Sequence, residues 1–344
     1  MLAGERRGVY CHLGNTRNYI VRWNDMLLSV VVPCFNEGSN VHSFYEYTTN
    51  ILAREDFQYE LVFVNDGSSD DTLSCLKELS DRYEEVSYIS FSRNFGKEAA
   101  MLAGLQYAEG DAVVLMDGDL QHPPELIPQM VHYYSKGYHQ VIAKRNRKGD
   151  AVIKSSLSKL YYKMMNKFVD VSLVNGVGDF RLLSRKALNA LLSLNEYNRF
   201  SKGLFSWIGF KEYTINYENV VREEGESKWT FSKLLNYGID GVISFNNKPL
   251  RASIYMGMGV TVLGFIYVLT MLVKILFAGI DVPGYFTLIS AILIIGGLQL
   301  TFLGIIGEYI GRIYYESKKR PHYIIEEETM TAKHENHQKW HTHA

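Results

Sequence analysis

The chain has 344 residues, with 36 basic and 37 acidic side chains and a formal net charge of −1. This length suits one large domain or one domain with appendages, and a near-neutral charge argues against a nucleic-acid-binding protein, which normally has a basic excess. The three cysteines are odd in number and widely spaced, so neither a disulfide framework nor a metal-binding knuckle follows from them.

Residues 1–25 are polar and basic and lack the continuous apolar core of a secretory signal. We expect a flexible N-terminal extension, or translation from an upstream start codon. Residues 1 to about 250 have the mixed composition of a soluble enzyme, whereas residues from about 252 to 310 are strongly apolar. The sequence therefore predicts a globular part followed by a membrane part.

Apolar runs rich in β-branched residues alternate with segments of helical spacing through the globular part. The predicted strands are residues 27–33, 59–64, 86–91, 113–116, 140–143 and 216–221, and the predicted helices are residues 41–54, 71–83, 94–109 and 155–169. Residues 174–183 are interpreted as a polar interruption. Strands that alternate with helices favour an α/β fold with a mostly parallel sheet, whose ligands bind at the carboxyl ends of the strands.

Three polar clusters follow three of these strands. Asn36–Glu37 follows the first, Asp66–Ser68 the second and Asp117–Gln121 the fourth. Because the carboxyl ends of parallel strands meet at one edge, we expect the clusters to converge there.

Each of these clusters has a purely structural alternative. Glu37 is then a surface charge or the acid of a helix start, and Ser68 or Asp70 caps the next helix. The basic residues that follow the third strand then belong to a solvated helix start; they are Arg93, Asn94 and Lys97.

Asp117, Gly118 and Asp119 directly follow the fourth strand. Two carboxylates one residue apart can meet a single divalent cation, and glycine lets the backbone approach whatever the metal holds. Gln121 adds a neutral oxygen, and Mg2+ and Mn2+ prefer such oxygen ligands while they keep positions open for substrate phosphates. The alternative is a pair of solvated loop or capping carboxylates.

Two basic segments lie beyond this motif. Residues 144–148 (KRNRK) follow a predicted strand end, where they form either a phosphate clamp or a solvated loop. Residues 222–229 (REEGESKW) have few apolar side chains and predict a mobile loop. Arg222 and Lys228 would let this loop close over a diphosphate; otherwise it is an ordinary charged loop.

The apolar part begins with an amphipathic segment, residues 231–245, which is either an interfacial helix or a core helix. Ile254–Val273 and Phe286–Gly307 contain 20 and 22 residues without a charge. Each is long enough to cross a hydrocarbon core of about 30 Å, and a buried helical hairpin is the alternative. Basic residues lie on both flanks, which places the globular part in the cytoplasm; they are Lys248, Arg251, Arg312, Lys318, Lys319 and Arg320.

The C-terminal segment, residues 324–344, is acidic and then rich in histidine, and we expect a solvated disordered tail, with metal binding as the alternative. The expected domains are a flexible extension over residues 1–25, a catalytic domain over 26–230, an interfacial helix over 231–250, a two-helix transmembrane region over 251–312 and a cytoplasmic tail over 313–344.

Six segments together resemble the family 2 glycosyltransferases of the GT-A fold. They are VVPCFNEG at 31–38, VFVNDGSSDDT at 62–72, SRNFGKEAA at 92–100, MDGDLQHPPE at 116–125, GDFRL at 178–182 and REEGESKW at 222–229. The likeness covers residues 27–323 and is strongest to the polyprenyl-phosphate branch, which includes dolichol-phosphate mannose synthases and GtrB-type bactoprenol glucosyltransferases.

The resemblance implies roles for individual residues. It implies a nucleotide-sugar pocket lined by Pro33, Phe35, Glu37, Val64, Asp66, Lys97, Asp117 and Gly118. It implies a metal site of Asp117, Asp119 and Gln121, and catalytic roles for Asp119, Asp179 and Arg181. Arg145, Arg222 and Lys228 would contact the phosphates of the donor or the lipid.

The resemblance also implies an inverting, Mg2+- or Mn2+-dependent transfer of a hexose, most often from UDP-glucose, to undecaprenyl phosphate. UDP-N-acetylglucosamine and GDP-mannose are alternative donors, and a non-catalytic sugar-nucleotide sensor is an alternative from another class. The implied protein is a multi-pass inner-membrane homotetramer with a cytoplasmic catalytic domain and no nucleic-acid partner. A separate flippase and a downstream glycosyltransferase would use its product for cell-envelope glycans.

Overall fold

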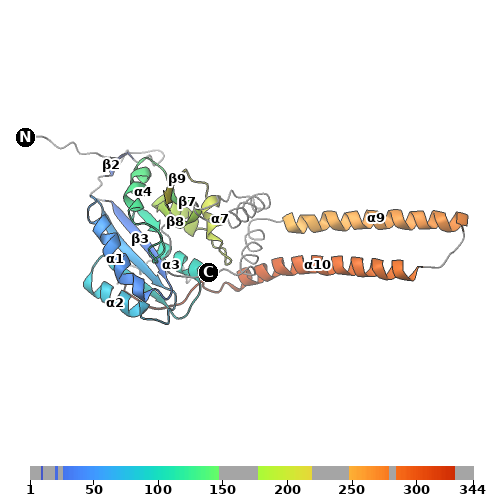
Figure 1. Cartoon of the computed structure of the whole chain (residues 1–344), viewed down its shortest axis with the longest axis horizontal. Coiled ribbons are helices and arrows are strands. Elements are labelled where there is room, and N and C mark those ends of the chain that lie inside the picture. Colours follow the sequence, from blue (N-terminus) through green and yellow to red (C-terminus); the bar gives the residue numbers. More distant parts are fainter. Residues whose placement is uncertain are drawn as a thin grey trace, which may run out of the picture. The chain divides into compact units, whose positions relative to one another are not determined.

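The computed structural model describes residues 9–10, 20–21, 26–146, 177–218, 248–278 and 284–329. The chain divides into two compact units (Figure 1). The first comprises residues 1–164, 171–229 and 320–344, and the second comprises residues 165–170 and 230–319. The predictions for residues 155–169, 222–229 and 231–245 and for the histidine-rich tail lie outside the described residues.

The first unit is built on a sheet of eight strands in the order β10-β5-β4-β3-β6-β8-β7-β9. Its strands are β3 (Leu27–Cys34), β4 (Gln58–Asn65), β5 (Val86–Phe91), β6 (Ala112–Leu115), β7 (Gln140–Asn146), β8 (Val177–Ser184), β9 (Glu212–Glu218) and β10 (Ile325–Glu328). The strands β3, β4, β5 and β6 are mutually parallel, as β7 and β9 are, while β8 and β10 are antiparallel to their neighbours. The two short strands β1 (Val9–Tyr10) and β2 (Ile20–Val21) pair separately.

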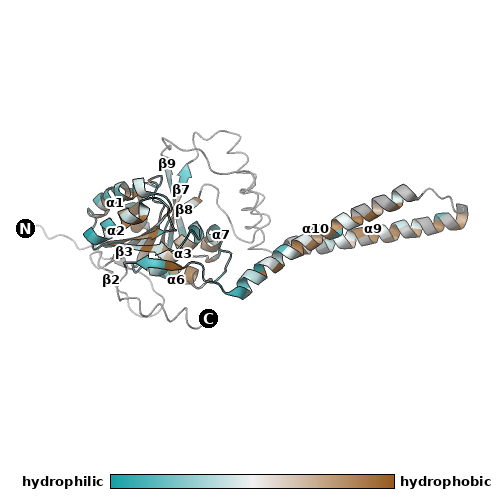
Figure 2. Cartoon of the chain, turned by 90° about the horizontal axis from the view of Figure 1, so that it is seen from below, coloured by the Kyte–Doolittle hydropathy of each residue, from teal (hydrophilic) through white to brown (hydrophobic). Residues whose placement is uncertain are grey.

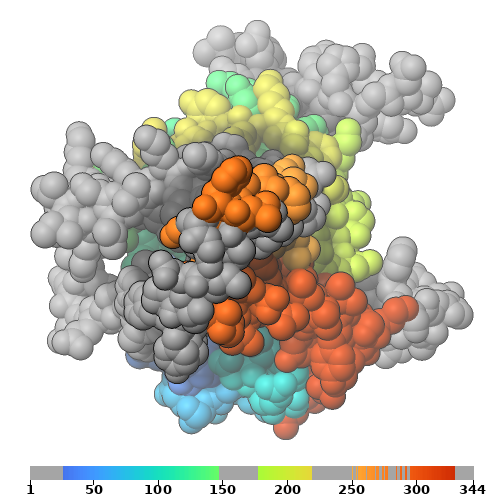
Figure 3. Space-filling view, turned by 90° about the vertical axis from the view of Figure 1, so that its right-hand side faces the viewer, coloured from blue at the N-terminus to red at the C-terminus, as the bar shows by residue number. Residues whose placement is uncertain are grey.

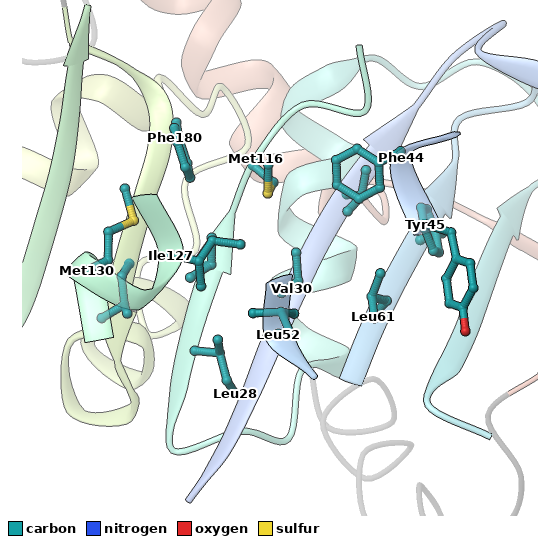
Figure 4. Packing of buried hydrophobic residues seen from close by; sticks show 14 of the residues in the cluster. Leu28, Val30, Phe44, Tyr45, Leu52, Leu61, Met116, Ile127, Met130 and Phe180 are labelled. Atoms are coloured by element: carbon teal, nitrogen blue, oxygen red, sulfur yellow. The ribbon is translucent and has the colours of Figure 1, made fainter. Parts of the chain in front are cut away.

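Helices cover both faces of the sheet, as the alternation predicts. They are α1 (Gly38–Leu52), α2 (Thr72–Arg82), α3 (Lys97–Tyr107), α4 (Leu126–Ser135), α6 (Arg185–Leu192) and α7 (Ser201–Trp207). Val30 and Leu61 pack with Phe44 of α1 in the core that the helices α1, α2 and α4 share (Figure 4). Val31 points to the opposite face because side chains alternate along a strand, and there it meets Gly104 of α3. Strands buried on both faces explain the continuous apolar runs.

The segment 174–183, interpreted from the sequence as a polar interruption, is wrongly assigned. Residues 177–184 form β8, which lies inside the sheet between β6 and β7. Phe180 and Leu182 are fully buried and alternate with Asp179 and Arg181, so the segment has the period of a strand. Two charged side chains make a buried central strand hard to recognise in the sequence, because their partners come from distant parts of the chain.

The expectation of a disordered tail is also wrong for residues 325–328, which form β10 at the edge of the sheet beside β5. The Tyr323 ring stacks on Phe91 with 4.8 Å between centroids, and its hydroxyl donates to Gln106 Oε1 over 2.6 Å. Lys77 Nζ lies 2.7 Å from Glu327 Oε1. An added strand covers the open edge that β5 would otherwise present.

The second unit contains two long helices that run side by side, α9 (Lys248–Ala278) and α10 (Tyr285–Lys318) (Figure 1). Both are predominantly apolar along much of their length, and the end of α10 is polar (Figure 2). Large apolar side chains on them are exposed, such as Leu263, Phe265, Phe277 and Leu300. Parts of the two helices are visible in orange and red-orange on the face that Figure 3 shows. The two expected membrane-spanning helices are not confirmed, because no helix among the described residues is long and apolar enough to cross a bilayer.

Candidate active site

The strand ends place the polar clusters at one edge of the sheet, as predicted. The strands β3, β4 and β6 are parallel, so Cys34, Asn65 and Leu115 end at the same edge. Because β8 is antiparallel to β6, its first residues lie at this edge too. The sheet thus adds a fourth polar segment, Val177–Asp179, that the predicted parallel order does not contain.

The first two clusters are joined by hydrogen bonds. The Asn36 amide donates to Ser68 Oγ over 2.9 Å, and the Ser69 amide donates to Asn36 Oδ1 over 2.9 Å. Asp70 accepts from the amides of both Gly38 and Thr72, each over 3.1 Å. Asp70 therefore ties the start of α1 to the start of α2, which agrees with its alternative interpretation as a capping residue.

Asp66 fixes the loop that leads into α3. Its carboxylate is 3% exposed and accepts from the Phe95 amide over 2.7 Å and from the Gly96 amide over 3.0 Å. Burial raises the pKa of Asp66, although these two N–H groups and Arg93 oppose the rise. The loop held in this way ends at Lys97, the first residue of α3.

Lys97 bridges two carboxylates from different strands. Its Nζ lies 2.7 Å from Asp117 Oδ1 and 2.8 Å from Asp179 Oδ2. Leu115 of β6 pairs with Arg181 of β8, so the same register continued by two residues brings Asp117 opposite Asp179. Burial opposes the charge on Lys97, but the two carboxylates outweigh it and hold the pKa of the ammonium above its ordinary value. The local field at this point favours a cation.

The Asp117–Gln121 loop has the oxygen donors that a hard divalent cation prefers. Asp119 Oδ1 accepts from the Gln121 amide over 3.1 Å, and Leu120 has a left-handed φ of 56°. Gly118 is packed so closely that an added Cβ would lie 3.3 Å from Val32 Cγ1. No group of three or more His, Cys, Asp or Glu side chains that could hold a metal occurs among the described residues. Two carboxylates and an amide still fit Mg2+ or Mn2+, which commonly take one or two carboxylates and complete their shell with substrate phosphates.

Comparison with known proteins agrees with these features. Residues 29–192 match the model of glycosyl transferase family 2, and residues 248–313 match that of the GtrB C-terminal hairpin. A putative glycosyltransferase, CsbB, of Bacillus subtilis is 57% identical over 89% of this chain and 93% of its own length. The chain belongs to glycosyltransferase family 2.

Two other comparisons add detail. The bactoprenol glucosyl transferase of Shigella phage SfV is 41% identical to this glycosyltransferase over 88% of the chain and 99% of its own length. A crystal structure of glucosyl-3-phosphoglycerate synthase from Mycobacterium tuberculosis, in complex with Mn2+, UDP-glucose and phosphoglyceric acid, is a more distant match. Its TM-score is 0.43 at 18% identity, covering 68% of this chain and 85% of the other.

Arg181 of this glycosyltransferase lies in the core, away from solvent. It is 3% exposed, donates to the Gly178 carbonyl over 2.9 Å and stacks its guanidinium 3.7 Å from the centroid of Phe205. Burial lowers the pKa of Arg181 to about 10. Its contacts attach the start of β8 to α7. The predicted contact of Arg181 with the phosphate of the acceptor substrate stays a prediction.

The remaining predicted site residues have different environments. Phe35 is 46% exposed, whereas Val64 is fully buried against α3. Glu37 immediately precedes α1, and its Oε2 accepts from Asn40. Arg145 lies near the carboxyl end of β7, at the same edge as Val177. Pro33 is partly exposed and lies directly before Cys34 at the end of β3. Arg222 and Lys228 lie outside the described residues.

Sequence reasoning missed three residues at or near this edge. His122 accepts a hydrogen bond from the Asp117 amide. Glu98 accepts from both the amide and the hydroxyl of Ser201, which joins α3 to α7. Tyr217 is near enough to Arg145 and the aspartates for their charges to affect its pKa, which burial raises. The only available signal was the position of His122 directly after Gln121, because the other two contacts join distant parts of the chain.

Proposed function

We propose that this glycosyltransferase transfers glucose from UDP-glucose to undecaprenyl phosphate, at the cytoplasmic face of the inner membrane. The main support is the position of Lys97 between Asp117 and Asp179, at the strand ends where a GT-A enzyme is expected to bind its donor. The choice of sugar and acceptor is supported by the 41% identity to a bactoprenol glucosyl transferase and by the matching C-terminal hairpin.

The donor diphosphate would bind beside Asp117, Asp119 and Gln121. A divalent cation held by their oxygens would neutralise the charge that grows on the diphosphate as it leaves. Each tenfold gain in rate requires about 1.4 kcal/mol of such preference for the transition state. Lys97 adds a second positive charge at the same place, and it is already ordered by its two ion pairs.

The acceptor phosphate needs no strong base. A phosphate monoester has a second pKa of about 6, so it is already a nucleophile at neutral pH. Burial works against ionisation of Asp179, but Lys97, Lys202 and Arg181 outweigh it and hold the pKa of its carboxyl below its ordinary value. A carboxylate of this kind is a poor proton acceptor, so we assign Asp179 the task of orienting Lys97.

In the reaction, an acceptor phosphate oxygen attacks the anomeric carbon of glucose. A new carbon–oxygen bond forms as the bond to the donor diphosphate breaks, and UDP leaves with the electron pair. Direct displacement inverts the anomeric carbon, so an α-linked donor gives a β-linked lipid phosphate.

The hairpin is proposed to hold the enzyme in the bilayer that contains its acceptor. Support comes from the exposed apolar side chains of α9 and α10 and from basic residues at both ends, Lys248 and Lys318 among them. More specifically, we propose that α9 and α10 each cross the bilayer once. The tetramer, the separate flippase and the downstream glycosyltransferase remain predictions of the resemblance.

The test uses purified full-length enzyme with undecaprenyl phosphate and either Mg2+ or Mn2+. UDP-glucose, UDP-N-acetylglucosamine and GDP-mannose are offered separately, and glycolipid is followed by mass spectrometry. We expect lipid-dependent product from UDP-glucose. If only another donor gives product, the sugar of that donor would replace glucose in the assignment. If the enzyme is folded and no donor gives product, the proposal is rejected.

Asp119→Asn provides the matched test of the site. Loss of one negatively charged oxygen that would hold the divalent cation should reduce transfer about a hundredfold or more. Asp56→Asn, an exposed carboxylate in the loop before β4, is the control and should leave transfer unchanged. Normal turnover by Asp119→Asn would reject the metal assignment.

A further inference from the structure

We propose that His122 is a positioning residue: the hydrogen bond from the Asp117 amide to its ring holds the Asp117–Asp119 loop in its metal-binding conformation. The proposal rests on the proposed metal site and gives a role to His122, which lies within the segment MDGDLQHPPE but is not among the residues that the resemblance implies for the metal site.

The hydrogen bond fixes the chemical form of the ring. The Asp117 amide donates to His122 Nδ1 over 3.0 Å. An imidazole nitrogen that accepts an N–H carries no proton itself, so the neutral ring has its proton on Nε2. The ring therefore acts toward the loop as a hydrogen-bond acceptor at a fixed place.

The ring itself is held by β8. Its side chain is 12% exposed and stacks on Phe180, with 5.0 Å between centroids and 21° between planes. Phe180 is fully buried and stands close to Met116 at the end of β6 (Figure 4). A Cβ added to Gly178 would lie 3.9 Å from His122 Nε2. His122 thus connects the backbone of Asp117 to the strand that carries Asp179.

Asp117 is restrained from two sides. Lys97 pairs with its carboxylate, and His122 accepts from its amide. The loop from Asp117 to His122 contains Leu120 in a left-handed conformation, which a non-glycine residue keeps only when its surroundings enforce it. Without the ring nitrogen, the amide loses its partner and the carboxylate remains tied only through a flexible lysine. The expected consequence is a loop that no longer presents both carboxylates to one cation.

A purely structural histidine would act through its ring packing alone. Two substitutions separate these roles. His122→Asn keeps an acceptor oxygen near the place of Nδ1 and removes the ring, whereas His122→Phe keeps the ring on Phe180 and removes the acceptor. His122→Gln is the matched control for Asn, because its longer side chain carries its amide group farther out, toward the place of Nε2.

The readout is Mn2+ affinity in the presence of UDP, measured by electron paramagnetic resonance on the full-length enzyme without lipid acceptor or sugar. We expect His122→Phe and His122→Gln to weaken Mn2+ binding about tenfold, and His122→Asn to stay within about threefold of wild type. A tenfold change corresponds to about 1.4 kcal/mol, which is within the usual cost of leaving a buried donor without its partner. Near-UV circular dichroism checks that each variant is folded.

Wild-type affinity in His122→Phe would overturn the proposal, as would a loss in His122→Asn equal to that in His122→Gln. Nitrogen-15 NMR of the wild-type ring gives an independent test, since a proton on Nδ1 instead of Nε2 would also overturn it. Mn2+ binding by wild type without glycolipid from any donor would reject the proposed function and leave the role of His122 standing.

Discussion

Lys97 occupies a position at which a lysine and a metal ion would compete for the same carboxylate. Its ammonium lies 2.7 Å from Asp117 Oδ1, and the lysine side chain is 46% exposed. Exposure weakens such an ion pair through screening by solvent. If the proposed divalent cation binds with the donor, we expect Lys97 to release Asp117 and to stay paired with Asp179.

Replacement of Lys97 by methionine should tighten Mn2+ binding in the absence of nucleotide. The change removes the competing ammonium and leaves two carboxylates, so we expect roughly two- to tenfold higher affinity by paramagnetic titration. Glucose transfer should fall, because the second positive charge near the diphosphate is lost. Lys97→Arg is the control that keeps the charge, and weaker Mn2+ binding by Lys97→Met would show that the lysine supports the loop instead.

Asp179 should stabilise the fold at neutral pH and lose this effect in acid. Burial opposes its charge, but its partners Lys97, Lys202 and Arg181 outweigh burial and lower the pKa of the carboxyl. A lowered folded-state pKa gives stability that is present above the ordinary value of about 3.9 and disappears as pH falls through the lowered one. The melting temperature of Asp179→Asn should thus lie below that of wild type at neutral pH, and the gap should narrow only below about pH 4. A gap that narrows between pH 7 and 5 would contradict this assignment.

At the scale of elements, β10 links the end of the chain to the catalytic sheet. It follows α10 after only a few residues and pairs with β5, so the segment after α10 belongs to the sheet of the first unit. Tyr323 anchors this return through its stack on Phe91 and its bond to Gln106. The edge strand is consequently part of the folded catalytic unit.

Tyr323→Ala should destabilise the catalytic unit by about 1–3 kcal/mol, because it removes an aromatic stack and a hydrogen bond. For a unit of this size, each kcal/mol lowers the melting temperature by roughly 2–4 °C. Tyr323→Phe keeps the ring and should cost only about 0.5–1.5 kcal/mol. Calorimetry in detergent measures both, and a wild-type melting temperature for Tyr323→Ala would mean that β10 adds no stability.

At the scale of the whole molecule, the two units have different surfaces. The sheet of the first unit is covered by helices, whereas α9 and α10 expose large apolar side chains along their length. An apolar surface of this extent marks a contact with lipid or with another protein. The proposed lipid acceptor makes the bilayer the fitting partner.

The hairpin should retain the enzyme in membranes through apolar contacts. We expect the full-length chain to stay with membranes in alkaline carbonate, and a variant with residues 248–318 replaced by a flexible linker to be released. High salt without carbonate is the control, since it removes only proteins that are held by charge. Release of the full-length chain by salt alone would contradict insertion of the hairpin.

Much of the fold is predictable because its signals are local. The strands β3, β4, β5 and β6 are continuous apolar runs that end in turn residues, so their positions follow from the sequence almost to the residue. Asp117, Gly118 and Asp119 are found in the same way, since the chemistry of the motif lies within three consecutive residues. The meeting of polar clusters at one edge follows from the parallel order alone.

The remaining features depend on contacts between distant parts of the chain. The strand β8 contains Asp179 and Arg181, whose burial is tolerated only because Lys97 and Phe205 lie against them. The tail gives no local sign that it pairs with β5, and His122 gains its role only where Phe180 holds the ring. The sequence by itself determined the parallel core and the carboxylate loop, because their patterns are periodic or contiguous. Only the tertiary structure decided which lysine, histidine and second aspartate surround that loop, because antiparallel pairing of β6 with β8 brings them together.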